Sequence, residues 1–353
     1  KLLLLSLEDA ACKLEMYGED GTIMREIELP DSMGSLSICH QHGAEEQNLY
    51  FSFESFRCPK SILKYDIASE TLETVYQVQE PTEEKIVVER KFVTARDEQQ
   101  ILAFLVYREG TVPNKTVPTL MYGYGGYSAS QLPWYNNPFI GLDIPDWVVQ
   151  GGLYVHCILR GGEEYGSKWH EAGCKLNKKN VFYDFIDIAK AVMQDGWTTP
   201  EHTAICGGSN GGLLVTALMT MEPSLWKCVI ASVPHTDMLH FSLDDRGPMY
   251  VTEYGDPRTD EYFEYMKSYS PYHNIHEGTK YPCAYIQTGE QDNNVPPYHG
   301  KKFAAAMQQA STGGDVLLRV LAKGSHDRGS GEVFYQTTAE MQVFIEHALG
   351  MRG

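Results

Sequence analysis

The chain of 353 residues is long enough for one large α/β domain and part of a second unit. Its formal net charge of −18 and isoelectric point of about 5.1 argue against nucleic acids and anionic membranes as partners. The apolar run Leu2 to Leu5 is too short for a membrane span or a signal core and is typical of a strand.

Short alternating apolar runs separated by turn residues make up about the first eighty residues. Strands are expected at Leu2 to Leu7, Lys13 to Met16, Ile23 to Ile27, Leu49 to Phe53, Ser61 to Tyr65 and Leu72 to Tyr76. Small strands at this regular spacing indicate antiparallel sheet blades. We therefore predict a partial antiparallel β unit over residues 1–80 and a second domain over residues 81–353.

From about Lys85 the pattern changes to an alternation of strands and helices. A hairpin is expected at 87–94 and 101–107, and parallel strands at 119–122, 154–159, 203–206, 228–232, 283–288 and 316–320. Helices are expected at 180–194, 211–221, 298–310 and 332–349. This alternation predicts an α/β fold with a doubly wound, mostly parallel sheet.

A Gly-x-Ser-x-Gly sequence, Gly207 to Gly211, lies between a predicted strand and a predicted helix. In that setting it indicates a nucleophile elbow, a turn so tight that only glycine fits on either side of the serine. Ser209 is thereby predicted to be a catalytic nucleophile exposed at the edge of the sheet.

An acid and a histidine are expected downstream of such a serine, in that order. Asp292 follows the predicted strand 283–288, and His326 lies in a glycine-rich loop after the strand 316–320. Both loops belong at the carboxyl ends of parallel strands, where the serine also lies. His326 would take the proton from Ser209, and Asp292 would orient the imidazole.

Other residues compete for these two roles. Some hydrolases place the acid one strand earlier, which leaves Asp237, Asp244 and Asp245 as alternatives to Asp292. The other downstream histidines are His235, His240, His273, His276 and His299. We expect a surface or capping role for His299, which begins a predicted helix, and ordinary loop positions for His273 and His276.

From Lys85 to its end, the chain resembles the prolyl oligopeptidase family of serine peptidases. Six motifs in the family's order carry the resemblance: Tyr122 to Tyr127, Arg160 to His170, Gly207 to Leu214, Thr252 to Pro257, the Asp292 loop and the His326 loop. The resemblance implies an α/β-hydrolase domain with Ser209, Asp292 and His326 as the triad and no cofactor. It also implies that the hydroxyl of Tyr124 and the backbone N–H of Asn210 form the oxyanion hole.

The resemblance also implies a substrate pocket, at which this sequence departs from the family. Tyr250 falls where the prolyl peptidases have a tryptophan that stacks on proline, and Asn294 falls where they have an arginine that binds a substrate carbonyl. Tyr127 falls where they usually have phenylalanine, and Tyr254 and Val295 match pocket-lining positions. A tyrosine can still stack on a pyrrolidine ring, and an amide can donate the same hydrogen bond without charge.

By the same resemblance, the N-terminal strands are the last blades of a β-propeller that limits entry to short peptides. We expect the rest of that propeller to come from a preceding part of a longer protein. The eight scattered cysteines form no Cys-x-x-Cys pair, and the histidines show no zinc motif, which predicts a reducing, cytoplasmic location and no metal.

The sequence thus predicts a serine-type oligopeptidase that cleaves short peptides on the carboxyl side of proline through an acyl-enzyme. A related peptidase without proline preference and an esterase or thioesterase on the same scaffold remain open. So do transpeptidation and a binding protein with an inactive triad. Cleavage after Lys or Arg is not expected, because Tyr250 and Thr252 are neutral where the basic-residue oligopeptidases are acidic.

Overall fold

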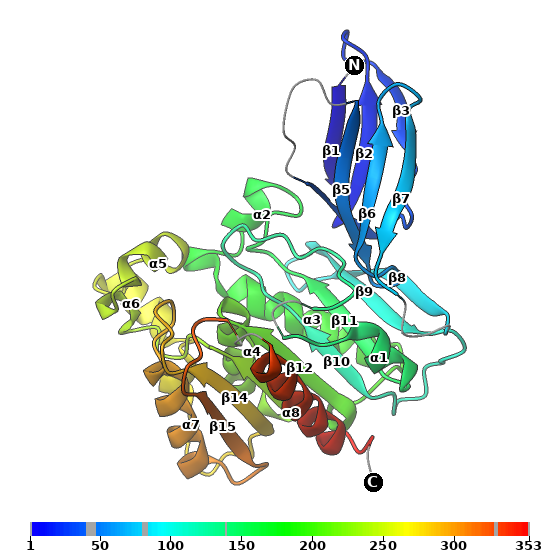
Figure 1. Ribbon diagram of the computed structural model, residues 1–353. Helices are drawn as coiled ribbons and strands as arrows, with labels where there is room; N and C mark the ends of the chain where they lie inside the picture. The colour runs from blue at the N-terminus through cyan, green and yellow to red at the C-terminus, as the bar shows by residue number, and fades with distance from the viewer. Residues whose placement is uncertain (1, 40–46, 80–83, 138–139, 328–330, 352–353) are drawn as a thin grey trace.

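The computed structural model describes residues 2–39, 47–79, 84–137, 140–327 and 331–351. An N-terminal group of antiparallel strands projects from a larger body of sheet and helices (Figure 1). The boundary predicted between residues 80 and 81 lies outside the described residues and stays a prediction.

The N-terminal strands form two separate antiparallel sheets. The first contains β1 (Leu2–Glu8), β2 (Ala11–Tyr17) and β3 (Ile23–Ile27). The second contains β4 (Gly34–Ile38), β5 (Asn48–Ser55), β6 (Ser61–Asp66) and β7 (Thr71–Gln77). Every strand predicted here is confirmed, but β4 was not predicted, because its sequence Gly-Ser-Leu-Ser-Ile has only two apolar residues among a glycine and two serines.

A small core joins the two N-terminal sheets. Leu14 of β2, Leu36 of β4, Phe53 of β5 and Leu63 of β6 are buried together. The backbone N–H of Leu36 also donates to the Cys12 thiol at 3.1 Å, linking β4 to β2.

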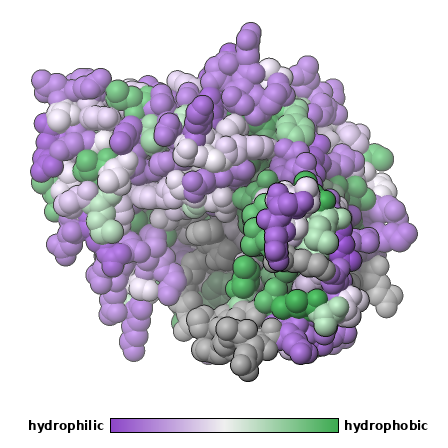
Figure 2. All heavy atoms as spheres, turned by 90° about the horizontal axis from the view of Figure 1, so that it is seen from above, coloured by the Kyte–Doolittle hydropathy of each residue, from purple (hydrophilic) through white to green (hydrophobic). Residues whose placement is uncertain are grey.

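Seen from the end that carries the N-terminal strands, the surface is predominantly hydrophilic and interrupted by hydrophobic patches (Figure 2), as the strongly acidic composition leads one to expect.

An eight-stranded, mostly parallel sheet forms the larger body, which confirms the predicted α/β fold. Its strands in spatial order are β15 (Val316–Leu321), β14 (Cys283–Gly289), β13 (Cys228–Ser232), β12 (Thr203–Gly208), β10 (Thr119–Tyr122), β11 (Leu153–Ile158), β9 (Gln100–Arg108) and β8 (Ile86–Thr94). Strands β8 and β9 are antiparallel to their neighbours, and the other pairs are parallel. The carboxyl ends of β12, β13, β14 and β15 therefore meet at one edge.

Helices cover both faces of this sheet (Figure 1). Buried residues of α3 (Lys179–Gln194), α4 (Asn210–Met221) and α7 (Tyr298–Ala310) share one core, and those of α1 (Ile144–Val149) and α8 (Glu332–Ala348) share the other. The helices α2 (Ser167–Glu171), α5 (Gly247–Tyr254) and α6 (Asp260–Lys267) lie in the connections beyond the carboxyl edge of the sheet. Within the described ranges, no helix combines the length and apolar character that crossing a membrane requires.

Candidate active site

Ser209 occupies the turn between β12 and α4, as predicted. Its backbone has φ of 57° and ψ of −115°, a conformation that is strained for a residue with a Cβ atom. The strain is held in place by the strand and the helix on either side and by a 2.9 Å hydrogen bond from the Ser209 N–H to the carbonyl of Ser232. The side chain is thereby displayed at the carboxyl edge of the sheet.

The glycines around Ser209 are required by close backbone approach. A Cβ atom on Gly207 would lie 2.3 Å from the carbonyl oxygen of Gly211, and one on Gly211 would lie 2.7 Å from that of Gly123. No flexible side chain could move aside, because the atoms approached belong to the backbone. The turn therefore tolerates no larger residue at either position.

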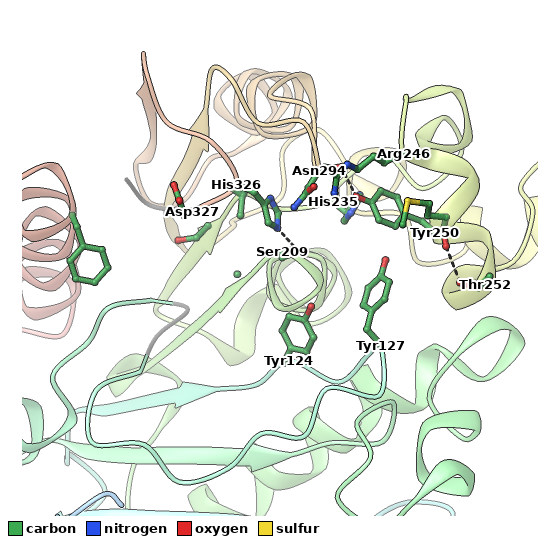
Figure 3. Close-up of a pocket in the computed structure, with 15 residues that line it drawn as sticks. Tyr124, Tyr127, Ser209, His235, Arg246, Tyr250, Thr252, Asn294, His326 and Asp327 are labelled. Atoms are coloured by element: carbon green, nitrogen blue, oxygen red, sulfur yellow. Dashed lines mark hydrogen bonds between the residues drawn. The ribbon is translucent and has the colours of Figure 1, made fainter. Parts of the chain in front are cut away.

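Ser209, His326 and Asp292 form a continuous hydrogen-bonded chain (Figure 3). The Nε2 atom of His326 lies 3.0 Å from the Oγ of Ser209, and its Nδ1 lies 2.8 Å from the Oδ2 of Asp292. The Asp292 side chain is fully buried, whereas that of His326 is partly exposed. This is the arrangement in which a histidine accepts a serine proton while a carboxylate holds the ring.

The second carboxylate oxygen of Asp292 is occupied by backbone donors. The N–H groups of Asn294 and Val295 each donate to Oδ1 at 2.8 Å. Hydrogen bonds to the charged form stabilise a buried carboxylate without a neighbouring cation. They also fix its plane, so that Oδ2 remains directed at His326.

The two predicted oxyanion donors lie beside the serine. Asn210 is the first residue of α4, so its backbone N–H has no acceptor within the helix. The hydroxyl of Tyr124 points toward Ser209 (Figure 3), and burial raises the pKa of Tyr124 to about 12, so that the phenol keeps its proton. Both groups can therefore donate to an oxygen next to Ser209.

A buried ion pair supports the loop that carries Tyr124. The ammonium of Lys178 donates to the carbonyl of Gly125 at 2.9 Å and to Glu253 at 3.1 Å, and His170 lies 2.8 Å from the other Glu253 oxygen. Burial raises the pKa of Glu253, but the charges and hydrogen bonds of Lys178 and His170 outweigh it and hold that pKa below its ordinary value. The loop is thus tied to α5 through charged groups rather than by apolar packing.

A cavity of about 720 Å³ opens in front of the serine. Of the residues predicted to bind substrate, Tyr127, Tyr250 and Asn294 line it. Tyr254 and Val295 do not, because both are buried behind its wall. The Tyr254 hydroxyl instead donates to the Asn210 side chain at 3.0 Å.

Aromatic side chains meet edge to face at one end of the cavity. The ring of Tyr250 lies 6.2 Å from that of Tyr127 and 5.0 Å from the imidazole of His235, at interplanar angles of 82° and 79°. The Tyr250 hydroxyl donates to the carbonyl of Asn294 at 2.7 Å, which fixes the orientation of its ring. These rings form an apolar wall suited to a compact side chain.

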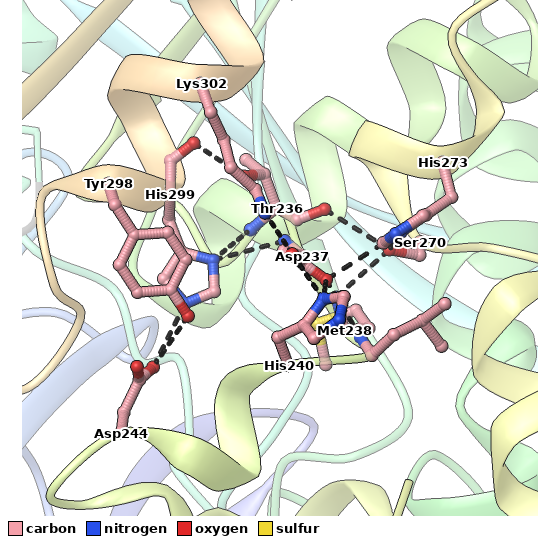
Figure 4. A network of polar contacts seen from close by, with 11 residues as sticks. Thr236, Asp237, Met238, His240, Asp244, Ser270, His273, Tyr298, His299 and Lys302 are labelled. Carbon is pink, nitrogen blue, oxygen red and sulfur yellow. Dashed lines mark hydrogen bonds and ion pairs between the residues drawn. The ribbon is translucent and has the colours of Figure 1, made fainter.

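Asp237, the alternative acid, belongs to a different network (Figure 4). Its fully buried carboxylate lies 2.8 Å from the Nδ1 of His240 and forms an ion pair with Lys302. Its side chain has no contact with His326 among the described residues. His240 and His273 could share a metal ion with Asp237, but the Lys302 ammonium already occupies the carboxylate.

The expected surface or capping role of His299 is wrong. His299 is fully buried, and its Nδ1 atom accepts hydrogen bonds from the backbone N–H groups of Thr236 and Asp237 at 3.2 and 3.1 Å. Its other ring nitrogen lies 3.3 Å from Asp244, which also accepts from the hydroxyl of Tyr298 (Figure 4). The ring thus supports the chain after β13 instead of meeting solvent.

Several residues of the site were not predicted to lie in it, apart from His235, which was an alternative to His326. His235, Arg246 and Met249 line the cavity, and Lys178 and Glu253 brace it from behind. The signal for Arg246 and Met249 is the long aromatic-rich segment 237–272 between two strands, because binding residues are often found on such long connections. Nothing in the local sequence marks Lys178 or His235, since their importance comes from contacts with distant segments.

Comparisons with known proteins agree with this geometry. A family model described as "Prolyl oligopeptidase family" matches residues 143–352, and one described as "Prolyl oligopeptidase, N-terminal beta-propeller domain" matches residues 1–78. A prolyl endopeptidase of Elizabethkingia meningoseptica is 36% identical over 349 residues, which are 97% of this chain and 48% of that protein.

Solved structures give the same result. A structure from a study of two prolyl endopeptidases superposes with a TM-score of 0.92 at 32% identity, covering 99% of this chain and 51% of the other. A post-proline cleaving enzyme from Rickettsia typhi gives a TM-score of 0.89 at 27% identity, covering 99% and 50%. The chain spans about half the length of the relatives it matches. With a family model that matches more than half of its residues, this chain belongs to the prolyl oligopeptidase family.

Proposed function

We propose that this chain carries the catalytic site of a serine-type oligopeptidase that cleaves short peptides on the carboxyl side of proline. The observation that supports it most directly is the 3.0 Å separation of Ser209 Oγ and His326 Nε2 beside an aromatic cavity. The family of the chain supports the same chemistry.

In the acylation step, Ser209 attacks the peptide carbonyl while His326 accepts its proton. Asp292 stabilises the imidazolium through its 2.8 Å contact with Nδ1 and remains ionised itself. The hydroxyl of Tyr124 and the N–H of Asn210 donate to the carbonyl oxygen as its negative charge develops. His326 then returns the proton to the leaving amine, and the carbonyl stays bound to Ser209 as an ester.

In the deacylation step, a water molecule replaces the amine. His326 accepts its proton, the hydroxide attacks the ester, and the proton passes to the departing Ser209 oxygen. Every proton moves between Ser209, His326, substrate and water. The sequence of steps therefore requires no cofactor.

Specificity for proline is proposed from the aromatic end of the cavity. Tyr250 and Tyr127 offer ring surface to a pyrrolidine, and proline lacks the N–H and the long side chain that other residues would have to desolvate. Arg246 contributes a positive charge to the same cavity and forms no ion pair with any described residue. That charge disfavours Lys and Arg at the aromatic end of the cavity, whereas the acidic Asp327 lines the cavity on the other side of His326.

An esterase or thioesterase is the second candidate, favoured by the departures at Tyr250 and Asn294. A triad with an oxyanion hole serves any acyl transfer, so the cavity decides the substrate. A peptidase of this family without proline preference is the third candidate, for the same reason.

Short peptides are the proposed partners, with a propeller around the N-terminal strands limiting their size. We also propose a reducing, cytoplasmic setting. Each described cysteine is a free thiol, and five of the eight are buried, Cys12, Cys157, Cys174, Cys206 and Cys228. Labelling of thiols in the freshly isolated protein, before and after reduction, tests that setting.

Initial rates on blocked peptide amides that differ only in the cleaved residue test the main proposal. The set contains Pro, Ala, Phe and Arg, with a short acyl ester and the Ser209→Ala variant alongside. We expect the highest kcat/KM for Pro and loss of turnover in Ser209→Ala. Ester turnover without peptide cleavage would replace the peptidase with an esterase, and equal rates for Pro and Ala would remove the proline preference.

A further inference from the structure

His235 is a buried histidine whose polar atoms have no protein partner. Its side chain is only 2% exposed, yet it lines the cavity in front of Ser209. Its Nδ1 atom is fully buried without a hydrogen bond. Its Nε2 atom also bonds to no described residue but is not fully buried, so it is the ring nitrogen that a group in the cavity can reach. A buried polar atom without a hydrogen bond costs roughly 1–3 kcal/mol of stability. The presence of a histidine at this position therefore calls for an explanation.

The surroundings of His235 are aromatic. Its ring lies 5.0 Å from Tyr250, 5.9 Å from Tyr254 and 5.2 Å from His299, each in an edge-to-face arrangement. Burial, His299, His326 and Lys178 together lower the pKa of His235, which keeps the imidazole neutral. A neutral imidazole can accept one hydrogen bond and donate another.

His235 lies in the part of the site where the side chain of the cleaved residue is proposed to bind. It follows β13, next to the strand that leads to Ser209, and lies between Asn294 and Tyr250 (Figure 3). Tyr127 and Tyr250 form the apolar part of the same wall. The wall therefore combines ring surface for a compact apolar group with one unsatisfied polar group.

We propose that His235 is a specificity residue that hydrogen-bonds the side chain of the cleaved residue, so that the cavity prefers a compact apolar side chain bearing a hydroxyl. The matching substrate is a peptide cleaved after 4-hydroxyproline, whose ring packs on Tyr250 while its hydroxyl meets the imidazole. This inference rests on the proposed function and names the substrate class of that site. A plain proline would leave the histidine unsatisfied, and sites built to hydrogen-bond a substrate hydroxyl discriminate against analogues without it.

The test compares matched substrates that differ by one hydroxyl. Peptide amides with proline, (4R)-hydroxyproline or (4S)-hydroxyproline at the cleaved position are assayed with the purified full-length protein, His235→Val and His235→Gln. We expect one hydroxyproline peptide to exceed the proline peptide by about tenfold in kcat/KM, the effect of one added hydrogen bond. That ratio should fall to 1 or below in His235→Val and be partly retained in His235→Gln.

Only ratios within each enzyme are compared, so a general loss of activity in a variant does not affect the result. If both hydroxyproline peptides are cleaved no faster than proline by the unmodified protein, or if His235→Val keeps the same ratio, the inference is overturned while the peptidase stands.

A binding measurement tests the inference even in a protein that has no peptidase activity. Calorimetry of Ser209→Ala with the blocked dipeptide acids ending in proline or hydroxyproline reports the effect of the hydroxyl on Kd. A tighter hydroxyproline complex that is lost in Ser209→Ala/His235→Val supports the inference. Equal affinities contradict it, whatever the enzyme catalyses.

Discussion

Asp292 and Asp237 follow neighbouring strands, and each carboxylate is fully buried against a histidine, yet their surroundings differ. Asp292 is satisfied by two backbone N–H groups and by His326, and no lysine or arginine of the described ranges forms an ion pair with it. Asp237 is neutralised by the ammonium of Lys302 and also contacts His240. A carboxylate that is already paired with a cation stabilises an imidazolium less well. The surroundings of each carboxylate therefore favour Asp292 over Asp237 as the catalytic acid more than the strand position does.

The largest difference in kcat is expected between the two variants in which one of these aspartates is replaced by asparagine. Asp292→Asn should lower kcat by about 10⁴, because the amide favours the wrong tautomer of His326. Asp237→Asn should leave kcat within about tenfold of the unmodified protein while lowering the free energy of unfolding by about 3 kcal/mol through loss of the ion pair. Steady-state kinetics and urea unfolding on both variants separate the two roles, and the reverse pattern would make Asp237 the catalytic acid.

The next effect is at the oxyanion donor. Tyr124→Phe should lower kcat by about 10²–10³ with little change in KM, because the hydroxyl acts on charge that develops only in the transition state. Tyr127→Phe is the matched control, since its ring lines the cavity without lying beside the serine oxygen. Equal losses of kcat in the two variants would show that Tyr124 serves packing.

Lys302→Met should destabilise the fold by about 3 kcal/mol near pH 7, because it leaves the buried Asp237 carboxylate without its cation. Burial alone raises the pKa of Asp237, but the hydrogen bonds and charges of Lys302 and His240 outweigh burial and hold it below the ordinary value of 3.8. In the folded protein this carboxylate is therefore stabilising above pH 3.8, and the contribution is lost as the pH falls through the lowered pKa.

Without Lys302 the folded-state pKa of Asp237 should rise, so the stability deficit of the variant should shrink as the pH is lowered from 7 toward 4. Lys301→Met is the control, because Lys301 pairs with the half-exposed Glu290 and should cost less than about 1 kcal/mol. Urea unfolding at several pH values measures both variants. A deficit independent of pH would contradict the ion-pair account.

The smallest expected effect is at Arg246, which is exposed, whereas Lys302 is partly buried. Arg246→Ala should reduce the preference for Glu over Lys beside the cleaved proline by a factor of about 3–5, the size of an exposed charge interaction. The preference in the unmodified protein should weaken between low and high salt, because exposed charges are screened. A preference that is unchanged by Arg246→Ala or by salt would show that Arg246 does not contact substrate.

The parts of the molecule that could be predicted from sequence are those set by local pattern. Strand and helix alternation follows from runs of apolar residues, and the Ser209 turn follows from glycines whose missing side chains are required by backbone contacts. The order serine, acid, histidine placed Asp292 and His326 in loops that the parallel sheet brings to one edge. The order of strands and loops along the chain was therefore sufficient to bring these two residues to the edge where Ser209 lies.

The remaining features depend on tertiary contacts that no local pattern reports. His299 begins a helix and looked exposed, but the chain after β13 covers it. Lys178 resembles any surface lysine until Glu253, 75 residues away, is placed against it. Tyr254 and Val295 match pocket positions of the family but are buried and do not line the cavity, because other side chains of the wall cover them.

The central claim, that Ser209 is activated by His326 and Asp292, is tested most directly by labelling with a fluorophosphonate, which reacts with an activated serine. Peptide mapping by mass spectrometry should find the label on Ser209 in the unmodified protein and in Asp237→Asn. The labelling rate should fall by several orders of magnitude in His326→Ala and Asp292→Asn. Labelling of another serine, or a rate that falls in Asp237→Asn and not in Asp292→Asn, would contradict the account.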